Sequence, residues 1–199
     1  MKMTLVAVGL FCVFGTLSLL LQRSARWSNF LGASGSLLGC AVGIGPAIAT
    51  LLSGRVETYR AAWNVPLGSF SVRIDALSAL FLVPIFVLCA MAALYGSRAM
   101  TTHQDRRNLG AFWFFYNTLV ASMAMVAVAA NGLLFLVSWE IMALSSFFLV
   151  TFEHEKESVR RAGWTYLVAT HLGTAFLLLL FLTLDRKSTR LNSSHEWIS

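Results

Sequence analysis

Charged residues are scarce in this chain of 199 residues, since only 12% are Asp, Glu, Lys or Arg. A soluble globular domain carries about 25% charged residues, and about half of its residues are apolar. The 57% hydrophobic content therefore argues against an ordinary soluble enzyme, a disordered protein and a nucleic-acid-binding protein. The formal net charge is +6. In so apolar a chain, we interpret these cations as a signal of membrane orientation rather than of an acidic partner.

The sequence also lacks the cysteine patterns that mark disulfide frameworks and metal sites. The three cysteines, Cys12, Cys40 and Cys89, lie singly inside apolar runs, and the sequence contains no Cys-x-x-Cys pair and no Cys/His cluster. It therefore supports neither a disulfide framework nor a metal site.

Long apolar runs make up most of the chain. Six of them are long enough to cross about 30 Å of hydrocarbon at about 1.5 Å per helical residue. Because lipid cannot satisfy backbone polar groups, each run is predicted to be a helix. The predicted spans are 3–21, 31–52, 75–95, 111–130, 132–151 and 163–184. The expected fold class is an all-α membrane protein with about six transmembrane helices.

The loops between these spans alternate in charge. The loops after the first, third and fifth spans carry eight Lys or Arg residues, whereas the N-terminus and the other two loops carry four. By the positive-inside rule, the more basic loops face the cytoplasm and the N-terminus faces outside. The long loop 53–74 then lies outside. Its end, 69–74, alternates polar and apolar residues, which is typical of a strand on a bundle surface.

The last segment, 185–199, differs abruptly from the spans because it is polar and patternless. Residues 185–195 match the translation of a common short-read sequencing adapter, and a genuine basic tail is the alternative. We therefore expect that 185–199 is not native sequence and forms no part of the native fold. We expect 1–184 to be an N-terminal fragment of a longer protein, which sequencing of the source gene across the Leu184 codon would test.

Glu140 is the most informative residue, because it lies near the centre of the fifth predicted span. A charged side chain there costs about 2.5–3.5 kcal/mol on insertion scales. Its neighbours one helical turn away are apolar, so any partner must come from another helix. The functional interpretation is a proton relay or an ion-coupling site. The structural interpretation is a glutamate hydrogen-bonded to a neighbouring helix.

His171 is the second intramembrane ionisable residue. It lies about eight residues into the sixth predicted span, and Glu140 lies about as far into the antiparallel fifth span, so the two should meet near the membrane midplane. Imidazole titrates near neutral pH and can pass a proton through its two nitrogens. The alternative is a core histidine that donates to Thr170, Thr174 or a carbonyl.

Two further polar residues have structural interpretations. Asp75 opens the third span, where a carboxylate can cap free N–H groups and favour the helix dipole. Asn117 in the fourth span can hydrogen-bond across helices. Trp113 and Trp164, near the predicted cytoplasmic ends, fit an interfacial aromatic belt.

The loop between the fifth and sixth spans contains Glu153, Arg160 and Arg161. We interpret it as a solvated turn whose charges pair with one another. A role in partner docking or proton uptake is the alternative.

Several segments resemble a known family. Ser138–Val150, around Glu140, and Ile74–Ser78 resemble the fifth span and the start of the third span of antiporter-like subunits of the complex I superfamily. This family includes the large membrane subunits of complex I, Mrp-type sodium/proton antiporters and the membrane arms of energy-converting nickel–iron hydrogenases. Thr151–Glu155 and Thr170–Thr174 are most similar to the formate hydrogenlyase or hydrogenase-four branch.

This resemblance implies a bundle of about fourteen helices built around inverted repeats. Residues 1–110 would supply the three leading helices with the external loop at 53–74, and 111–184 would begin the first repeat. Glu140 would pair with a lysine on a broken seventh helix, and protons would move along a hydrated midplane relay that includes His171. Because the chain has no seventh span and no intramembrane lysine, we expect it to be incomplete for translocation.

The resemblance also implies partners. We expect a multi-pass subunit of a prokaryotic inner-membrane redox complex that moves protons, with sodium as a second candidate ion. Other membrane and peripheral subunits would carry iron–sulfur clusters and nickel–iron or flavin. We expect no cofactor, metal, catalytic redox site or nucleic-acid partner for this chain.

Two other functional classes remain as alternatives. One is a non-conducting membrane scaffold, in which Glu140 only holds helices together. The other is a rhomboid-like intramembrane serine protease, based on Ser34 in a Gly-x-Ser-Gly motif and on His171. That protease would need the serine hydroxyl within hydrogen-bond reach of the imidazole.

Overall fold

The computed structural model describes residues 1–61, 70–100 and 108–195, with side chains up to residue 184. Within these residues it contains six helices and one two-stranded hairpin. The helices are α1 (Lys2–Leu20), α2 (Ala25–Ser53), α3 (Ala76–Ala99), α4 (Leu109–Val128), α5 (Gly132–Val150) and α6 (Glu157–His195); the strands are β1 (Glu57–Ala61) and β2 (Phe70–Ile74).

All six helices are long and apolar enough to cross a membrane, α6 over Glu157–Leu184. The all-α class and the six spans expected from the sequence are therefore confirmed. Two helices begin earlier than expected, α2 at residue 25 instead of 31 and α6 at 157 instead of 163. The physical reason is that a helix does not need to stop where the hydrocarbon ends, because water and headgroups tolerate a polar first turn.

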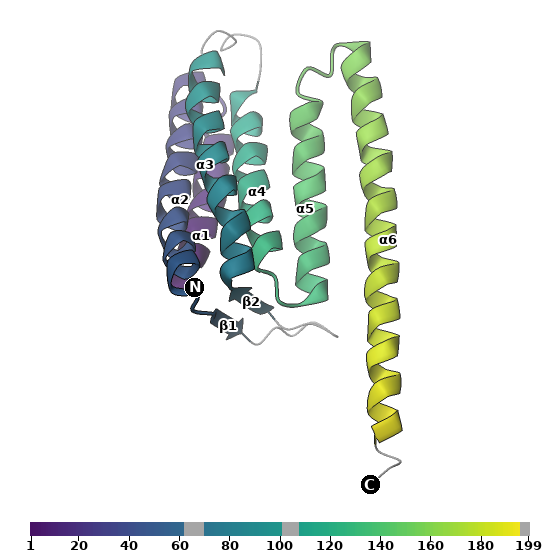
Figure 1. The fold of residues 1–199 in the computed structure, drawn as a ribbon. Helices are drawn as coiled ribbons and strands as arrows, with labels where there is room; N and C mark the ends of the chain where they lie inside the picture. The colour runs from purple at the N-terminus through teal and green to yellow at the C-terminus, as the bar shows by residue number, and fades with distance from the viewer. Residues whose placement is uncertain (62–69, 101–107, 196–199) are drawn as a thin grey trace.

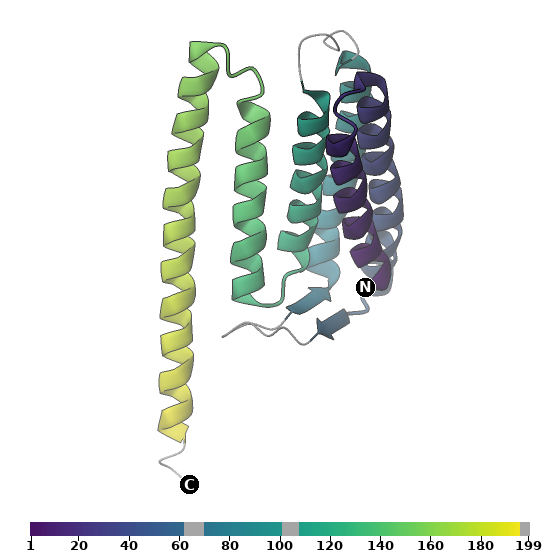
Figure 2. The ribbon, with the colours of Figure 1, turned by 180° about the vertical axis from the view of Figure 1, so that it is seen from behind.

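The helices form a cluster with an extension on one side. α1 to α4 pack together, α5 lies against α4, and α6 lies against α5 at the edge of the molecule (Figures 1 and 2). Successive helices run in opposite directions, so the N-terminus, the hairpin and the α4–α5 turn share one end (Figure 1). The α1–α2 turn and the α5–α6 loop, which carry basic residues, therefore share the other end, as the positive-inside argument requires.

Close packing in the cluster depends on glycines along α2. Gly32, Gly35, Gly39 and Gly43 all lie under aromatic rings from neighbouring helices. At Gly32, an added Cβ would lie 2.2 Å from Cγ of Trp113, so the ring of α4 rests directly on the backbone of α2. Small residues provide such contacts between membrane helices, where lipid removes the usual hydrophobic drive for helix association.

The hairpin closes the end of the bundle that carries the N-terminus. β1 and β2 pair antiparallel, and β2 also contacts the α4–α5 turn through a bridge between Val72 and Ala129. Val72 and Ile74 are buried whereas Arg73 is exposed, as expected for alternating residues of a strand on a surface. The strand predicted over 69–74 is confirmed for Phe70–Ile74, and residue 69 lies outside the described residues. The partner strand β1 was not anticipated.

α6 continues without interruption from the last apolar turn to His195. The segment 185–195 contains no glycine or proline, and adding residues to an existing helix is much easier than starting one. That 185–199 is an adapter translation stays a prediction.

Candidate functional site

The candidate site lies between α5 and α6, about halfway along α5. Glu140 projects from the middle of α5 with 31% of its side chain exposed, and His171 projects from α6 with 52% exposed. Their neighbours are apolar side chains and hydroxyl groups such as those of Thr170 and Thr174. The structure therefore places two ionisable groups in a region where the chain is otherwise uncharged.

The two side chains face each other. Nε2 of His171 lies 4.0 Å from Oε2 of Glu140, so the meeting of these residues expected from the helix register is observed. This separation is within ion-pair range but longer than a direct hydrogen bond. As expected, the partner of Glu140 comes from a different helix.

A backbone carbonyl orients the imidazole. Nδ1 of His171 lies 2.9 Å from the carbonyl oxygen of Leu167. Because a carbonyl can only accept, Nδ1 is the donor in this contact, which leaves Nε2 for a partner on another helix. That nitrogen is the one that faces Glu140. The carbonyl partner that we allowed for His171 is therefore present, and it directs the imidazole toward the carboxylate.

The neighbouring threonines do not bind this histidine. Oγ1 of Thr170 donates to the carbonyls of Tyr166 and Leu167, and Oγ1 of Thr174 donates to the carbonyl of Thr170. The threonine contacts that we considered for His171 are therefore not observed. Each hydroxyl instead donates to a backbone carbonyl about one turn earlier in α6, as Ser and Thr hydroxyls commonly do in helices.

Asn117 is a structural residue of the bundle interior. It is fully buried, its amide oxygen accepts from Oγ of Ser36 at 3.0 Å, and its amide nitrogen donates to the carbonyl of Gly32 at 3.1 Å. The predicted hydrogen bond across helices is confirmed, between α4 and α2. The sequence reasoning missed Ser36, although a serine among the small residues of a span is a signal for helix contact.

Trp113 does not belong to an interfacial belt, and that prediction was wrong. Its side chain is fully buried, and Nε1 donates to Oδ1 of Asn29 at 2.8 Å. The amide nitrogen of Asn29 in turn donates to the carbonyl of Ser97 at 2.8 Å. The physical reason is Gly32, which leaves room on α2 for the indole. Trp164 is 67% exposed, which agrees with a position in the belt.

Asp75 caps α3, as the sequence indicated. Oδ1 accepts from the backbone N–H of Ser78 at 2.9 Å, and Oδ2 accepts from the Arg73 guanidinium at 2.9 Å. The hydrogen bond from the Ser78 backbone, together with the smaller effect of Arg73, holds the pKa of the Asp75 carboxyl below its usual range. Asp75 lies at the hairpin end of the bundle, away from the candidate site.

The charged side chains of the turn between α5 and α6 contact other groups of the same turn. Glu153 forms an ion pair with Lys156, and Nη1 of Arg160 donates to the carbonyls of His154 and Glu155, at 2.9 Å each. The pairing within the turn that the structural interpretation expected is therefore observed for Glu153 and Lys156, and a role in partner docking or proton uptake stays a prediction. Arg161 is exposed near the start of α6. None of these residues reaches Glu140, because the loop lies at the end of both helices.

The protease alternative is not supported. Ser34 lies on α2, where its Oγ donates to the carbonyl of Leu31, and α4 and α5 separate α2 from the helix of His171 (Figures 1 and 2). A serine–histidine dyad therefore cannot form within this fold. In the part of the chain that the structure describes, no three potential ligands among His, Cys, Asp and Glu gather at one point.

Comparison with known proteins places the chain in a family. No family model matches it. Hydrogenase-4 component B of Escherichia coli K12 is 31% identical over 175 residues, which cover 88% of this chain and 26% of that protein. NADH-quinone oxidoreductase subunit L of Mycobacterium tuberculosis H37Rv is 30% identical over 179 residues, which cover 84% of this chain and 27% of that protein. A putative antiporter subunit of Staphylococcus haemolyticus is 24% identical over 156 residues, which cover 75% of this chain and 19% of that protein.

The fold is also similar to part of a larger chain in a solved structure. This structure is the membrane-bound sulfane sulfur reductase, an archaeal respiratory membrane complex; the TM-score is 0.73 at 22% identity, over 92% of this chain and 28% of that chain. This chain spans about a quarter of the length of hydrogenase-4 component B and of subunit L. It belongs to the antiporter-like membrane subunits of the complex I, Mrp and hydrogenase-4 superfamily.

Proposed function

We propose that this chain is part of a proton-translocating membrane subunit of a complex I-like or energy-converting hydrogenase complex, in which Glu140 and His171 exchange a proton. The observation that carries the proposal is the 4.0 Å approach of Nε2 of His171 to Oε2 of Glu140 across α5 and α6. Intramembrane ionisable residues are costly, and they mark proton relays when they are paired in this way.

The pair can hold a proton on either partner. With one shared proton, the pair is either an ionised Glu140 beside a charged His171 or two neutral side chains, and both forms have zero net charge. The proton can therefore pass between Oε2 and Nε2 without placing a net charge in the low-dielectric interior. Adding or removing one more proton changes the net charge, and a charged group elsewhere in a longer subunit could bias that step.

The scaffold alternative is weaker because Glu140 and His171 differ from the residues that hydrogen-bond α2 to α4. Asn117, Ser36 and Trp113 supply hydrogen bonds between neighbouring helices in the cluster, and all three are uncharged and buried. Glu140 and His171, by contrast, are partly exposed and make no direct side-chain hydrogen bond to each other at 4.0 Å.

The setting of the chain is part of the same proposal. The printed names of the relatives include a hydrogenase component, an NADH-quinone oxidoreductase subunit and a putative antiporter subunit. We infer a prokaryotic inner-membrane location, other membrane and peripheral subunits as partners, and redox cofactors held by those partners. Protons are the proposed cargo, and sodium is the second candidate ion.

Replacing Glu140 with glutamine tests the relay. The change Glu140→Gln keeps the size of the side chain and removes the group that ionises, so proton pumping by the assembled complex in inverted membrane vesicles should fall about tenfold or more. Assembly, measured on native gels, should be unchanged. Glu157→Gln makes the same chemical change at the exposed start of α6 and should leave pumping intact.

The opposite result would favour the scaffold. Normal pumping by the Glu140→Gln complex would remove the carboxylate from the relay. Loss of assembly together with pumping would show that Glu140 holds the helices in place.

A further inference from the structure

The carbonyl oxygen of Leu167 on α6 has two side-chain donors within reach. Nδ1 of His171 lies 2.9 Å from it, and Oγ1 of Thr170 lies 3.0 Å from it. In an α-helix, the same oxygen also accepts from the backbone N–H four residues later, which here belongs to His171. A carbonyl oxygen has two lone pairs. Three donors therefore compete for two acceptor positions, and the imidazole is one of the three.

The Thr170 hydroxyl has a second acceptor. Oγ1 also lies 3.0 Å from the carbonyl oxygen of Tyr166. A hydroxyl carries one hydrogen, and its equal distances to the Tyr166 and Leu167 carbonyls favour neither. When the hydrogen points to Tyr166, the Leu167 carbonyl is left for the imidazole. When it points to Leu167, the hydroxyl and the imidazole compete for that carbonyl.

The Leu167 contact determines which nitrogen of the neutral imidazole carries the hydrogen. A donor contact at Nδ1 leaves Nε2 with a free lone pair. Nε2 lies 4.0 Å from Oε2 of Glu140, so in this tautomer Nε2 of His171 can accept a proton from a protonated Glu140. In the other tautomer the hydrogen is on Nε2, which can then donate to the carboxylate but cannot accept from it.

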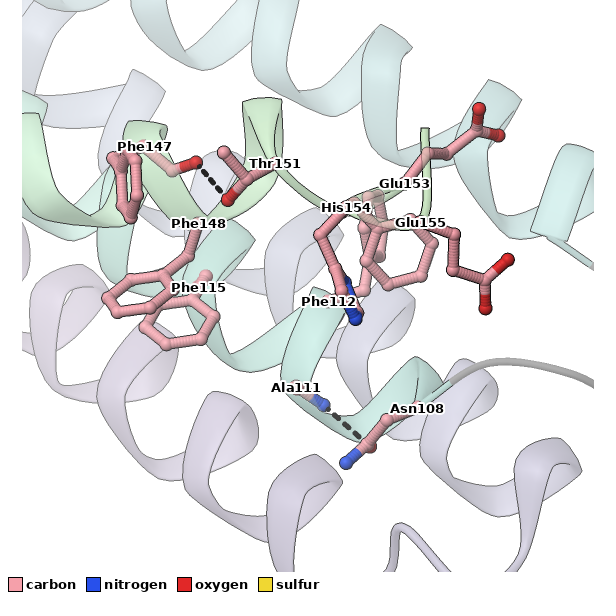
Figure 3. Close-up of a pocket in the computed structure, with 11 residues that line it drawn as sticks. Asn108, Ala111, Phe112, Phe115, Phe147, Phe148, Thr151, Glu153, His154 and Glu155 are labelled. Atoms are coloured by element: carbon pink, nitrogen blue, oxygen red, sulfur yellow. Dashed lines mark hydrogen bonds between the residues drawn. The ribbon is translucent and has the colours of Figure 1, made fainter. Parts of the chain in front are cut away.

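A cavity at the loop end of α5 does not control this contact. Its volume is about 380 Å³, and the described residues that line it run from Asn108 at the start of α4 to Glu155 in the α5–α6 loop (Figure 3). Neither His171 nor Thr170 is among them, so this cavity does not account for the orientation of the imidazole. The Thr170 hydroxyl, by contrast, shares an acceptor with it.

We propose that Thr170 is a positioning residue for His171, whose hydroxyl competes for the Leu167 carbonyl and so sets how often Nε2 is free to accept a proton from Glu140. This inference rests on the proposed relay for its functional meaning. A hydroxyl that points to Tyr166 favours the tautomer with hydrogen on Nδ1, and one that points to Leu167 disfavours it. Proton exchange is therefore regulated by a neighbouring group of the same helix.

Replacing Thr170 with valine tests this inference, because valine keeps the branched shape and lacks the hydroxyl. The full chain is labelled with nitrogen-15 histidine and placed in lipid vesicles at about pH 9, where imidazole side chains are mostly neutral. Nitrogen-15 NMR distinguishes protonated from unprotonated ring nitrogens, and the signals that His171→Gln loses identify His171. Thr170→Val should raise the ratio of the Nδ1–H to the Nε2–H tautomer about two- to tenfold, the effect of one net hydrogen bond.

Two variants separate this effect from a change in packing. Thr170→Ser keeps the hydroxyl and should keep the original ratio. Thr174→Val removes a hydroxyl that donates to the carbonyl of Thr170 at 3.1 Å, an acceptor that the imidazole does not share, and should keep the ratio too. An unchanged ratio in Thr170→Val, or an equal rise in Thr174→Val, would overturn the inference.

The tautomer ratio is measured without proton transport, so the inference and the relay can fail separately. A raised ratio in Thr170→Val together with normal pumping by Glu140→Gln would support control of the imidazole by Thr170 and remove the relay. An unchanged ratio together with lost pumping by Glu140→Gln would overturn the role of Thr170 and leave the relay supported.

Discussion

Single residues decide how closely the helices of this bundle approach. Gly32 is the clearest example, because the indole of Trp113 lies where a Cβ would be, 2.2 Å from its Cγ. Trp113 also donates to Asn29, so the ring cannot move away without breaking a buried hydrogen bond. One hydrogen atom in place of a methyl group thus allows both the packing and the hydrogen bond.

The substitution Gly32→Ala should therefore destabilise the protein. Overpacking of this kind costs about 1–3 kcal/mol, which should appear as a lower melting temperature in detergent. Gly45→Ala on the same helix is the matched control, since nothing lies within 4 Å of the Cβ that it would add. Similar melting of the two variants would show that α2 and α4 can move apart at little cost.

Glu140 and His171 illustrate a different effect at this scale. Their positions along two antiparallel spans predicted that they would meet, and they lie 4.0 Å apart. The nitrogen that faces the carboxylate was not predictable, because it depends on a contact with the carbonyl of Leu167. The proposed exchange of a proton with Glu140 would therefore involve Nε2 of His171, an assignment that residue spacing alone does not contain.

At the scale of elements, side-chain caps define where the helices after the hairpin begin. Asp75, Asn108 and Asn131 each accept from backbone N–H groups in the first turn of α3, α4 and α5. The first N–H groups of a helix have no partner within the helix, so each cap satisfies one or more of them. These short local patterns are visible in the sequence.

The cap on α3 should make stability depend on pH. Because the pKa of Asp75 is lowered in the folded chain, its ionised form stabilises the fold at neutral pH, and this contribution is lost as the pH falls below about 4. Asp75→Ala should cost about 1 kcal/mol at pH 7 and less at pH 3. Unfolding in detergent at the two pH values would measure the difference.

A conservative variant separates the cap from the charge. Asn is as good a cap as Asp, so Asp75→Asn should keep most of the stability at pH 7 while losing the pH dependence. An equal loss for Asp75→Ala at both pH values would show that the charge of Asp75 contributes nothing to the stability of the fold.

At the scale of the whole molecule, the alternation of six helices separates two groups of connections. The hairpin and the α4–α5 turn share one end, and the α5–α6 loop lies at the other (Figure 1). The charge bias of the loops predicts that the hairpin end faces outside the cell.

Cysteine labelling would test this orientation. In a background without Cys12, Cys40 and Cys89, Thr58→Cys on β1 and Ser158→Cys at the start of α6 place thiols at two exposed positions at opposite ends. A membrane-impermeant maleimide should label Thr58→Cys in intact cells and Ser158→Cys only after the membrane is opened. The reverse pattern would mean that the chain is inserted the other way round.

Local and one-dimensional features could be predicted from the sequence. The number of spans follows from the length of the apolar runs, the strand at Phe70–Ile74 from its alternation, and the cap at Asp75 from its place before a helix. The meeting of Glu140 and His171 follows from their depth in antiparallel neighbours. Each of these inferences needs only residue order and the fixed rise of a helix or a strand.

Features that depend on which faces meet required the folded arrangement. The burial of Trp113 and the bond between Ser36 and Asn117 both depend on the rotation of one helix against another. The spans of this chain are apolar on every side, so their sequences do not mark a face for packing. Only the contacts of the assembled bundle distinguish the inward face from the lipid face, because lipid tails and the protein interior are equally apolar.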